Sequence, residues 1–157
     1  FGASFGFLLG MISMFASALL TGGVGPWLGY QVFAAAWIGL LAGSLPKKAR
    51  GLKEILMLIC FGIFASALFG VLMDLQFWPW ALGSNTQLSY LPNGDVSENL
   101  SRFVTFHFAT AMAWDVPRAI FTSVLIAFTG GAVLSALRRT HTRAAFMAPV
   151  VFSERVK

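Results

Sequence analysis

The 157-residue chain has very little charge. Only 11% of its residues are Asp, Glu, Lys or Arg, whereas 57% are hydrophobic, and its mean hydropathy is +0.77. The first charged side chain is Lys47, so the whole stretch 1–46 is uncharged. In a soluble domain, roughly a quarter of all residues are charged. The composition therefore excludes an ordinary soluble domain and predicts an integral membrane protein.

Cysteine and the usual metal ligands are equally scarce. The single cysteine, Cys60, lies within an apolar run, which excludes a disulfide framework and is typical of a small packing residue. His107 has no second His, Cys or carboxylate at ligand spacing, so no metal site is expected. No cofactor is expected either.

Catalytic signatures are also missing. The sequence contains no Gly-x-Ser-x-Gly, no His-Glu-x-x-His and no phosphate-binding Gly-rich loop followed by Lys-Ser/Thr. The chain is therefore not expected to be an enzyme, and it cannot hydrolyse ATP by itself. It also lacks a basic leader and a small-residue cleavage site, so no signal peptide is expected. Because it begins with Phe1 and is apolar at once, we expect a piece of a longer protein.

Four apolar segments are long enough to cross a membrane. A bilayer core of about 30 Å requires about 20 residues of helix. The predicted spans are residues 3–21, 27–45, 54–75 and 116–137. Between the first two lies "GGVGP", which we interpret as a tight turn because glycine reaches backbone conformations closed to other residues. The sequence predicts an all-α membrane protein with a single transmembrane domain over residues 1–147.

The basic residues fix the predicted orientation. Nine of the eleven fall between spans two and three or after span four, and only Arg102 and Arg118 belong to the other side. The positive-inside rule makes the nine-cation side cytoplasmic. Phe1 and Lys157 are then predicted to be cytoplasmic, with residues 148–157 as a cytoplasmic tail, in a multi-pass protein of the plasma membrane.

Small residues recur at four-residue spacing within three of the spans. Such rows allow close approach of helices in lipid, where little hydrophobic force drives association. They predict packing within the chain or, alternatively, docking of a separate membrane subunit. The rows are Gly2, Gly6 and Gly10; Ala35, Gly39 and Gly43; and Gly62, Ser66 and Gly70.

A polar stretch, residues 81–101, is predicted to form an external loop. Pro92 and Asn93-Gly94 indicate a turn, and "ENLSRFVTFHFATAMAW" predicts a short helix at the membrane surface. Asp115 is a plausible N-cap for span four, with Pro117 in the first turn of that helix.

Polar and aromatic side chains gather at the predicted outer ends of the spans. Aromatic residues there are also typical of an interfacial belt, and Arg118 could extend to lipid headgroups. Asp74 is costly at this depth unless paired, and we expect Arg118 as its partner. The candidate substrate-binding residues are Trp27, Tyr30, Gln31, Asp74, Gln76, Trp114, Asp115 and Arg118. They predict an external cup beneath the 81–101 loop for a medium-sized, partly polar ligand.

Several of these motifs resemble the S components of energy-coupling factor (ECF) transporters, of the actinobacterial type. The similar segments are "FGFLLGMISMFASALLTGGVGPWLGYQVFAAAWIGLLAGSLP", "GVLMDLQFWPW", "ENLSRFVTFHFATAMAWDVPRA" and "LRRTHTRAAF", within about residues 1–147. The resemblance implies a six-helix substrate-binding subunit, of which this chain would supply the last four helices. The missing front would include the first helix, which usually faces the coupling subunit.

The resemblance also implies a function and partners. An S component captures a vitamin at the extracellular face, and the group most similar here is assigned to cobalamin or a related corrinoid. Its partners are a transmembrane coupling subunit and two cytoplasmic ATPases, with membrane lipid around it and no nucleic acid. Two alternatives stay open: a structural or assembly subunit, which needs no polar cup, and a membrane enzyme acting on lipid, which needs an inner acidic cluster.

Overall fold

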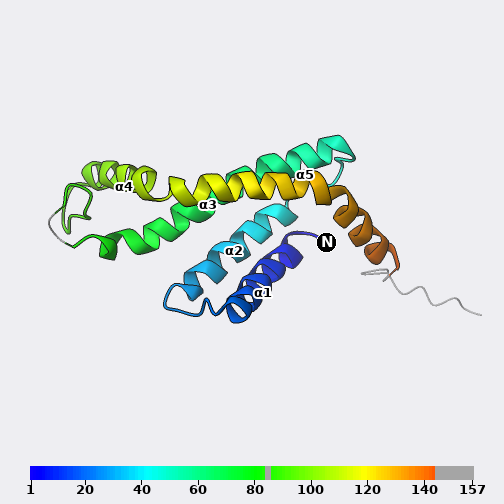
Figure 1. The fold of residues 1–157 in the computed structure, drawn as a ribbon, viewed down its shortest axis with the longest axis horizontal. Coiled ribbons are helices and arrows are strands. Elements are labelled where there is room, and N and C mark those ends of the chain that lie inside the picture. The colour runs from blue at the N-terminus through cyan, green and yellow to red at the C-terminus, as the bar shows by residue number, and fades with distance from the viewer. Residues whose placement is uncertain (84–85, 144–157) are drawn as a thin grey trace, which may run out of the picture.

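The computed structural model describes residues 1–83 and 86–143, and these residues form an all-helical fold without strands (Figure 1). The predicted tail 148–157 lies outside the described residues. The five helices are α1 (Ala3–Thr21), α2 (Leu28–Gly43), α3 (Leu52–Ala81), α4 (Val96–Thr110) and α5 (Met112–Arg143). The bounds predicted for the first span are confirmed, whereas α3 and α5 extend beyond the predicted 54–75 and 116–137.

Three helices, α1, α3 and α5, are long and apolar enough to cross a membrane. Helix α2 is apolar but has only 16 residues. Large apolar side chains cover much of the surface: Leu20 is 87% exposed and Phe128 is 85% exposed. Such exposure is unfavourable in water and favourable in lipid. The described chain therefore has the length, composition and surface of a membrane-embedded bundle.

The "GGVGP" segment connects α1 to α2, as predicted. Gly22 follows the last residue of α1 with φ 68°, a left-handed conformation, and its N–H and that of Gly23 both donate to the Ala18 carbonyl. This is a glycine helix end, which satisfies a carbonyl that the last turn leaves without a partner. The interruption in the apolar run is therefore the point where α1 stops.

Helices α1 and α2 form a closely packed antiparallel pair (Figure 1). A Cβ on Gly6 would overlap the Gly39 carbonyl, and a Cβ on Gly39 would overlap that of Gly6. Gly10 meets Ala35 in the same way, and Gly43 meets Gly2. Two of the predicted small-residue rows therefore pack against each other within the chain, which confirms the packing interpretation for them.

Helices α3 and α5 form a second antiparallel pair, which runs lengthwise across Figure 1. The third small-residue row faces α5: a Cβ on Gly62 would lie 3.1 Å from the Thr122 methyl group, and one on Gly70 would overlap the Asp115 carboxylate. Helix α2 contacts α3 and so joins the two pairs. All three rows are used within the chain.

Helix α4 packs beside the last turns of α3, and the segment before it folds onto the same place. The predicted turn is confirmed: Asn93 has φ 63° and the Gly94 N–H donates to the Leu91 carbonyl. Asp95 then caps α4 by accepting from the Ser97 N–H. The surface helix predicted to reach Trp114 instead ends at Thr110.

Aromatic packing holds α4 against α3. Trp78 is buried against Phe103 and Tyr90, with ring centroids 5.4 and 5.5 Å apart, and its indole N–H donates to the Leu88 carbonyl at 2.7 Å. Arg102 of α4 donates to the carbonyls of Thr86 and Gln87. The described part of the 81–101 segment is therefore bound to α3 and α4.

The basic connection between α2 and α3 lies at the same end of the bundle as the C-terminal part of α5. Arg138 pairs with Glu54, and the ring of His141 packs edge-on against Phe1 at 5.0 Å. We call this the basic end, since it includes Lys47, Lys48, Arg50, Lys53, Arg138 and Arg139. The turn after α1, the last turns of α3 and helix α4 lie at the opposite, aromatic end.

Candidate functional site

Two hollows open between the helix pairs, and both include residues of α2 and α3. The first, the Tyr30–Gln76 hollow, lies at the aromatic end and has a volume of about 670 Å³. Residues from the turn and first half of α2 line one wall, and residues from the last turns of α3 line the other. They are Pro26, Gly29, Tyr30, Phe33, Ala34, Leu72, Leu75, Gln76, Pro79 and Trp80.

The Tyr30–Gln76 hollow has the chemistry of a small-molecule site. Tyr30, Phe33 and Trp80 provide aromatic faces, while the Tyr30 hydroxyl and the Gln76 amide provide hydrogen-bonding groups. Ligand sites are usually 300–1,000 Å³ in size, mostly apolar, with a few placed polar groups. Tyr30 and Gln76 were both predicted as site residues. Trp80, which is 82% exposed, was not among the candidate site residues.

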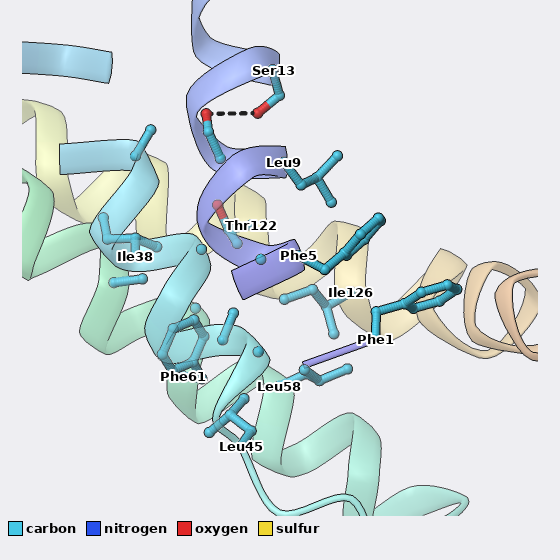
Figure 2. A pocket seen from close by; sticks show the side chains of 18 of the residues that line it. Phe1, Phe5, Leu9, Ser13, Ile38, Leu45, Leu58, Phe61, Thr122 and Ile126 are labelled. Atoms are coloured by element: carbon cyan, nitrogen blue, oxygen red, sulfur yellow. Dashed lines mark hydrogen bonds between the residues drawn. The ribbon is translucent and has the colours of Figure 1, made fainter. Parts of the chain in front are cut away.

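The second hollow, the central groove, is larger, at about 970 Å³, and runs between the α1–α2 pair and the α3–α5 pair (Figure 2). Figure 2 shows its apolar lining from all four helices, including Phe5, Ile38, Phe61 and Ile126. Gln31 and Arg118 lie at one end, and Lys47 and Glu54 at the other. The groove therefore follows the bundle for most of its length.

The predicted single cup is divided in the structure. Tyr30 lines the first hollow, whereas the next residue, Gln31, lines the groove. Consecutive residues on an α-helix point about 100° apart, so neighbours in sequence face different sides. Trp27 and Trp114, 48% and 73% exposed, line neither hollow. No described residue of the 81–101 segment lines either hollow, which differs from the cup predicted beneath this loop.

Asp115 and Arg118, both on α5, form an ion pair. The Asp115 carboxylate is buried, and its Oδ1 accepts from Arg118 Nη1 at 2.6 Å. Arg118 Nη1 also donates to the Ser66 carbonyl at 3.3 Å, and the guanidinium lies 5.0 Å from the Phe69 ring centroid. Asp115 Oδ2 is buried without a hydrogen-bond partner among the described residues. These contacts fix the guanidinium against α3.

Asp74 has a different partner from the predicted one. Its Oδ2 lies 2.8 Å from Nδ1 of His107 on α4, so the expected Asp74–Arg118 pair is wrong. The His107 ring is buried and stacks on Phe103 at 6.0 Å. Residue spacing along the two helices predicted a similar depth for Asp74 and Arg118. It did not predict the direction in which each side chain points.

The N-cap predicted for Asp115 is also wrong. Helix α5 begins at Met112, so Asp115 lies within its first turn, and its own N–H donates to the Ala111 carbonyl. The carboxylate is used for Arg118 instead. Two contacts were not expected from the sequence: Ser66 binds Arg118 through its carbonyl, and Gly70 makes room for Asp115. Their regular spacing was the available signal, but it indicated only close packing.

No group of three or more His, Cys, Asp or Glu residues is placed to hold a metal ion within residues 1–83 and 86–143. Asp74 and His107 contact each other between α3 and α4. Comparisons of the chain with protein-family models, with curated proteins and with solved structures find no match. The resemblance to S components rests on the sequence motifs alone.

Proposed function

We propose that the chain is a substrate-binding membrane subunit of an ECF-type uptake transporter. The observation that carries this proposal is the meeting of Tyr30, Gln76 and Trp80 in one hollow at the aromatic end. Aromatic faces there would stack on a flat ligand, while the amide and hydroxyl would fix its polar groups. A vitamin is the ligand class, and cobalamin is the first candidate to test.

Our proposed topology supports capture from outside. We assign the basic end to the cytoplasm by the positive-inside rule, so the Tyr30–Gln76 hollow opens at the extracellular face. We also assign α2 as a fourth span. Its 16 residues extend about 24 Å, and the bilayer accommodates such a shortfall at modest cost by local thinning. The four spans would be the C-terminal part of a six-helix bundle.

Uptake then requires partners. The sequence contains no nucleotide-binding signature, so the energy would come from two cytoplasmic ATPases through a transmembrane coupling subunit. High affinity outside has to be lost inside, which a change in the relative position of α2 and α3 would achieve, because the hollow is built between these two helices. The chain itself would carry out no covalent chemistry.

The test combines ligand identification with substitutions in the hollow. The protein is purified from cells grown with vitamins, and small molecules that copurify are identified by mass spectrometry. Uptake of labelled cobalamin and other vitamins is then measured with the coupling subunit and ATPases present. Tyr30→Ala and Gln76→Ala should abolish copurification and reduce uptake, whereas Phe64→Ala, on an exposed part of α3 away from the hollow, should not.

Trp114→Ala separates the hollow from the wider cup predicted from the sequence. Trp114 lines neither hollow and is 73% exposed, so its removal should leave uptake unchanged. Normal uptake in the Tyr30 and Gln76 variants, or wild-type protein that binds no vitamin, would contradict the proposal. Either result would favour the assembly-subunit alternative.

A further inference from the structure

The central groove combines an apolar channel with a guanidinium, that of Arg118, held in place at one end. Its lining is apolar for most of its length, and the hydroxyls of Ser13 and Ser66 already donate to the carbonyls of Gly10 and Gly62 (Figure 2 shows the first of these bonds). A polar solute would therefore find few partners along it. An apolar chain would find contacts throughout, because apolar side chains such as Leu9, Ile38 and Phe61 line the groove.

Arg118 places its charge at one end of this channel. The hydrogen bonds that it makes with described residues all use Nη1, which leaves Nε and Nη2 available, and its side chain is 38% exposed. A guanidinium binds phosphate through two parallel N–H groups. Asp115, Ser66 and the Phe69 ring hold the group in position, so little side-chain entropy is lost when an anion binds.

The depth of Arg118 matches that of lipid phosphates. Arg138 lies at the basic end, 20 residues further along α5, which corresponds to about 30 Å of helix and to the thickness of the bilayer core. We propose that the central groove holds a phospholipid, with its phosphate on Arg118 and one acyl chain along the apolar lining. This site is separate from the Tyr30–Gln76 hollow and does not depend on the transport function.

Native mass spectrometry tests the proposal directly. The full chain is reconstituted into bilayers of phosphatidylethanolamine and phosphatidylglycerol, extracted into mild detergent, and examined for retained lipid. Wild-type protein should retain a phospholipid. Asp115→Asn combined with Arg118→Gln should lower its occupancy by roughly tenfold. The double variant is preferred because Arg118→Gln alone would leave a buried carboxylate without its counter-charge.

A second pair of variants leaves Asp115 and Arg118 unchanged. Ala65 lines the groove, so Ala65→Phe should fill the acyl channel and also displace the lipid. Ala67 is exposed on the same helix outside the groove, so Ala67→Phe is the matched control and should retain lipid. Lys48→Gln, which alters a charge at the basic end outside the groove lining, should retain it too. Lys47→Gln tests the opposite end of the groove, where Lys47 is the alternative partner for a phosphate.

Three results would overturn the proposal. The first is a wild-type protein that retains no phospholipid, or that retains a fatty acid or soluble carboxylate in its place. The second is normal lipid retention in both the double variant and Ala65→Phe. The third is loss of lipid in Lys47→Gln but not in the double variant, which would place the phosphate at the other end. Circular dichroism confirms that each variant is folded.

Discussion

Gly70 of α3 and Asp115 of α5 lie in direct contact, because position 70 has no Cβ to occupy the space that the carboxylate fills. The same carboxylate binds Arg118, which in turn reaches back to α3 at the Ser66 carbonyl. A small residue therefore makes room for an acid, and the acid holds an arginine. This sequence of contacts joins the two longest helices at the aromatic end.

Gly70→Ala should destabilise the bundle. The added methyl group would overlap Asp115, so α3 and α5 would have to separate or the carboxylate would have to move from Arg118. Overpacking of this kind costs about 1–3 kcal/mol, measured as a lower thermal midpoint in detergent. Gly131→Ala is the control, because a Cβ there meets nothing within 4 Å. Equal midpoints for the two variants would contradict the close contact.

The Asp74–His107 pair should show energetic coupling. It joins α3 to α4 through two side chains that are largely buried, with exposures of 17% and 9%. Removing either partner leaves a buried polar group unsatisfied, which costs about 1–3 kcal/mol. In a cycle of Asp74→Asn, His107→Gln and the double variant, unfolding free energies should be non-additive by about 0.5–3 kcal/mol.

A matching cycle between Asp74 and Arg118 provides the control for this pair. These two residues were expected from the sequence to pair with each other, whereas in the structure they have separate partners. Their substitutions should therefore add within about 0.5 kcal/mol. Strong coupling between Asp74 and Arg118, with none between Asp74 and His107, would support the pairing expected from the sequence.

The comparison of these pairs explains which features the sequence could predict. Apolar run length predicted α1 and the approximate positions of α2, α3 and α5, and the four-residue spacing of small residues predicted close helix packing. Residue count also placed Asp74 and Arg118 at similar depths. However, depth does not determine rotation about the helix axis, and that rotation directs Asp74 to α4 and Arg118 to its own turn.

The candidate site has the same limitation. Tyr30 and Gln31 are adjacent in sequence and were assigned to one cup, yet they line different hollows. Which α2 residues line each hollow depends on how α2 packs against the neighbouring helices. This packing is a tertiary contact, and the local sequence pattern does not predict it. Trp78 and Trp80, near the end of α3, also differ in a way that their sequence positions do not predict. Trp78 is buried against α4, whereas Trp80 is exposed.

Asp95 should make the start of α4 sensitive to acid. Hydrogen bonds from the Ser97 hydroxyl and N–H lower the pKa of this carboxyl group below its ordinary 3.8. Because the folded-state pKa is the lower one, the stabilisation is complete above the unfolded-state pKa and is lost as pH falls through the folded value. The protection of the Ser97 N–H against hydrogen exchange, measured relative to the intrinsic exchange rate at each pH, should therefore fall in that acidic range.

Two substitutions of Asp95 distinguish the effect of its charge from the effect of its hydrogen bond to the start of α4. Asp95→Ala removes both, so exchange at Ser97 should be faster at every pH. Asp95→Asn keeps a good capping side chain without the carboxyl group, so exchange should be slow and should lose its acid-dependent step. The same acid response in wild type and Asp95→Asn would show that another group causes it.

The proposed orientation depends on nine cations and can be tested by labelling. In a Cys60→Ala background, Lys48→Cys lies at the basic end, while Asn93→Cys lies in the turn before α4. With intact cells, a membrane-impermeant maleimide should label the second variant and reach the first only after permeabilisation, because the positive-inside rule places Lys48 in the cytoplasm. The reverse pattern would turn the Tyr30–Gln76 hollow towards the cytoplasm, where it could not capture a nutrient from the medium. Labelling of both positions would instead mean that α3 and its neighbours do not span the membrane as a single bundle. The labelling pattern therefore tests the direction of transport independently of the ligand.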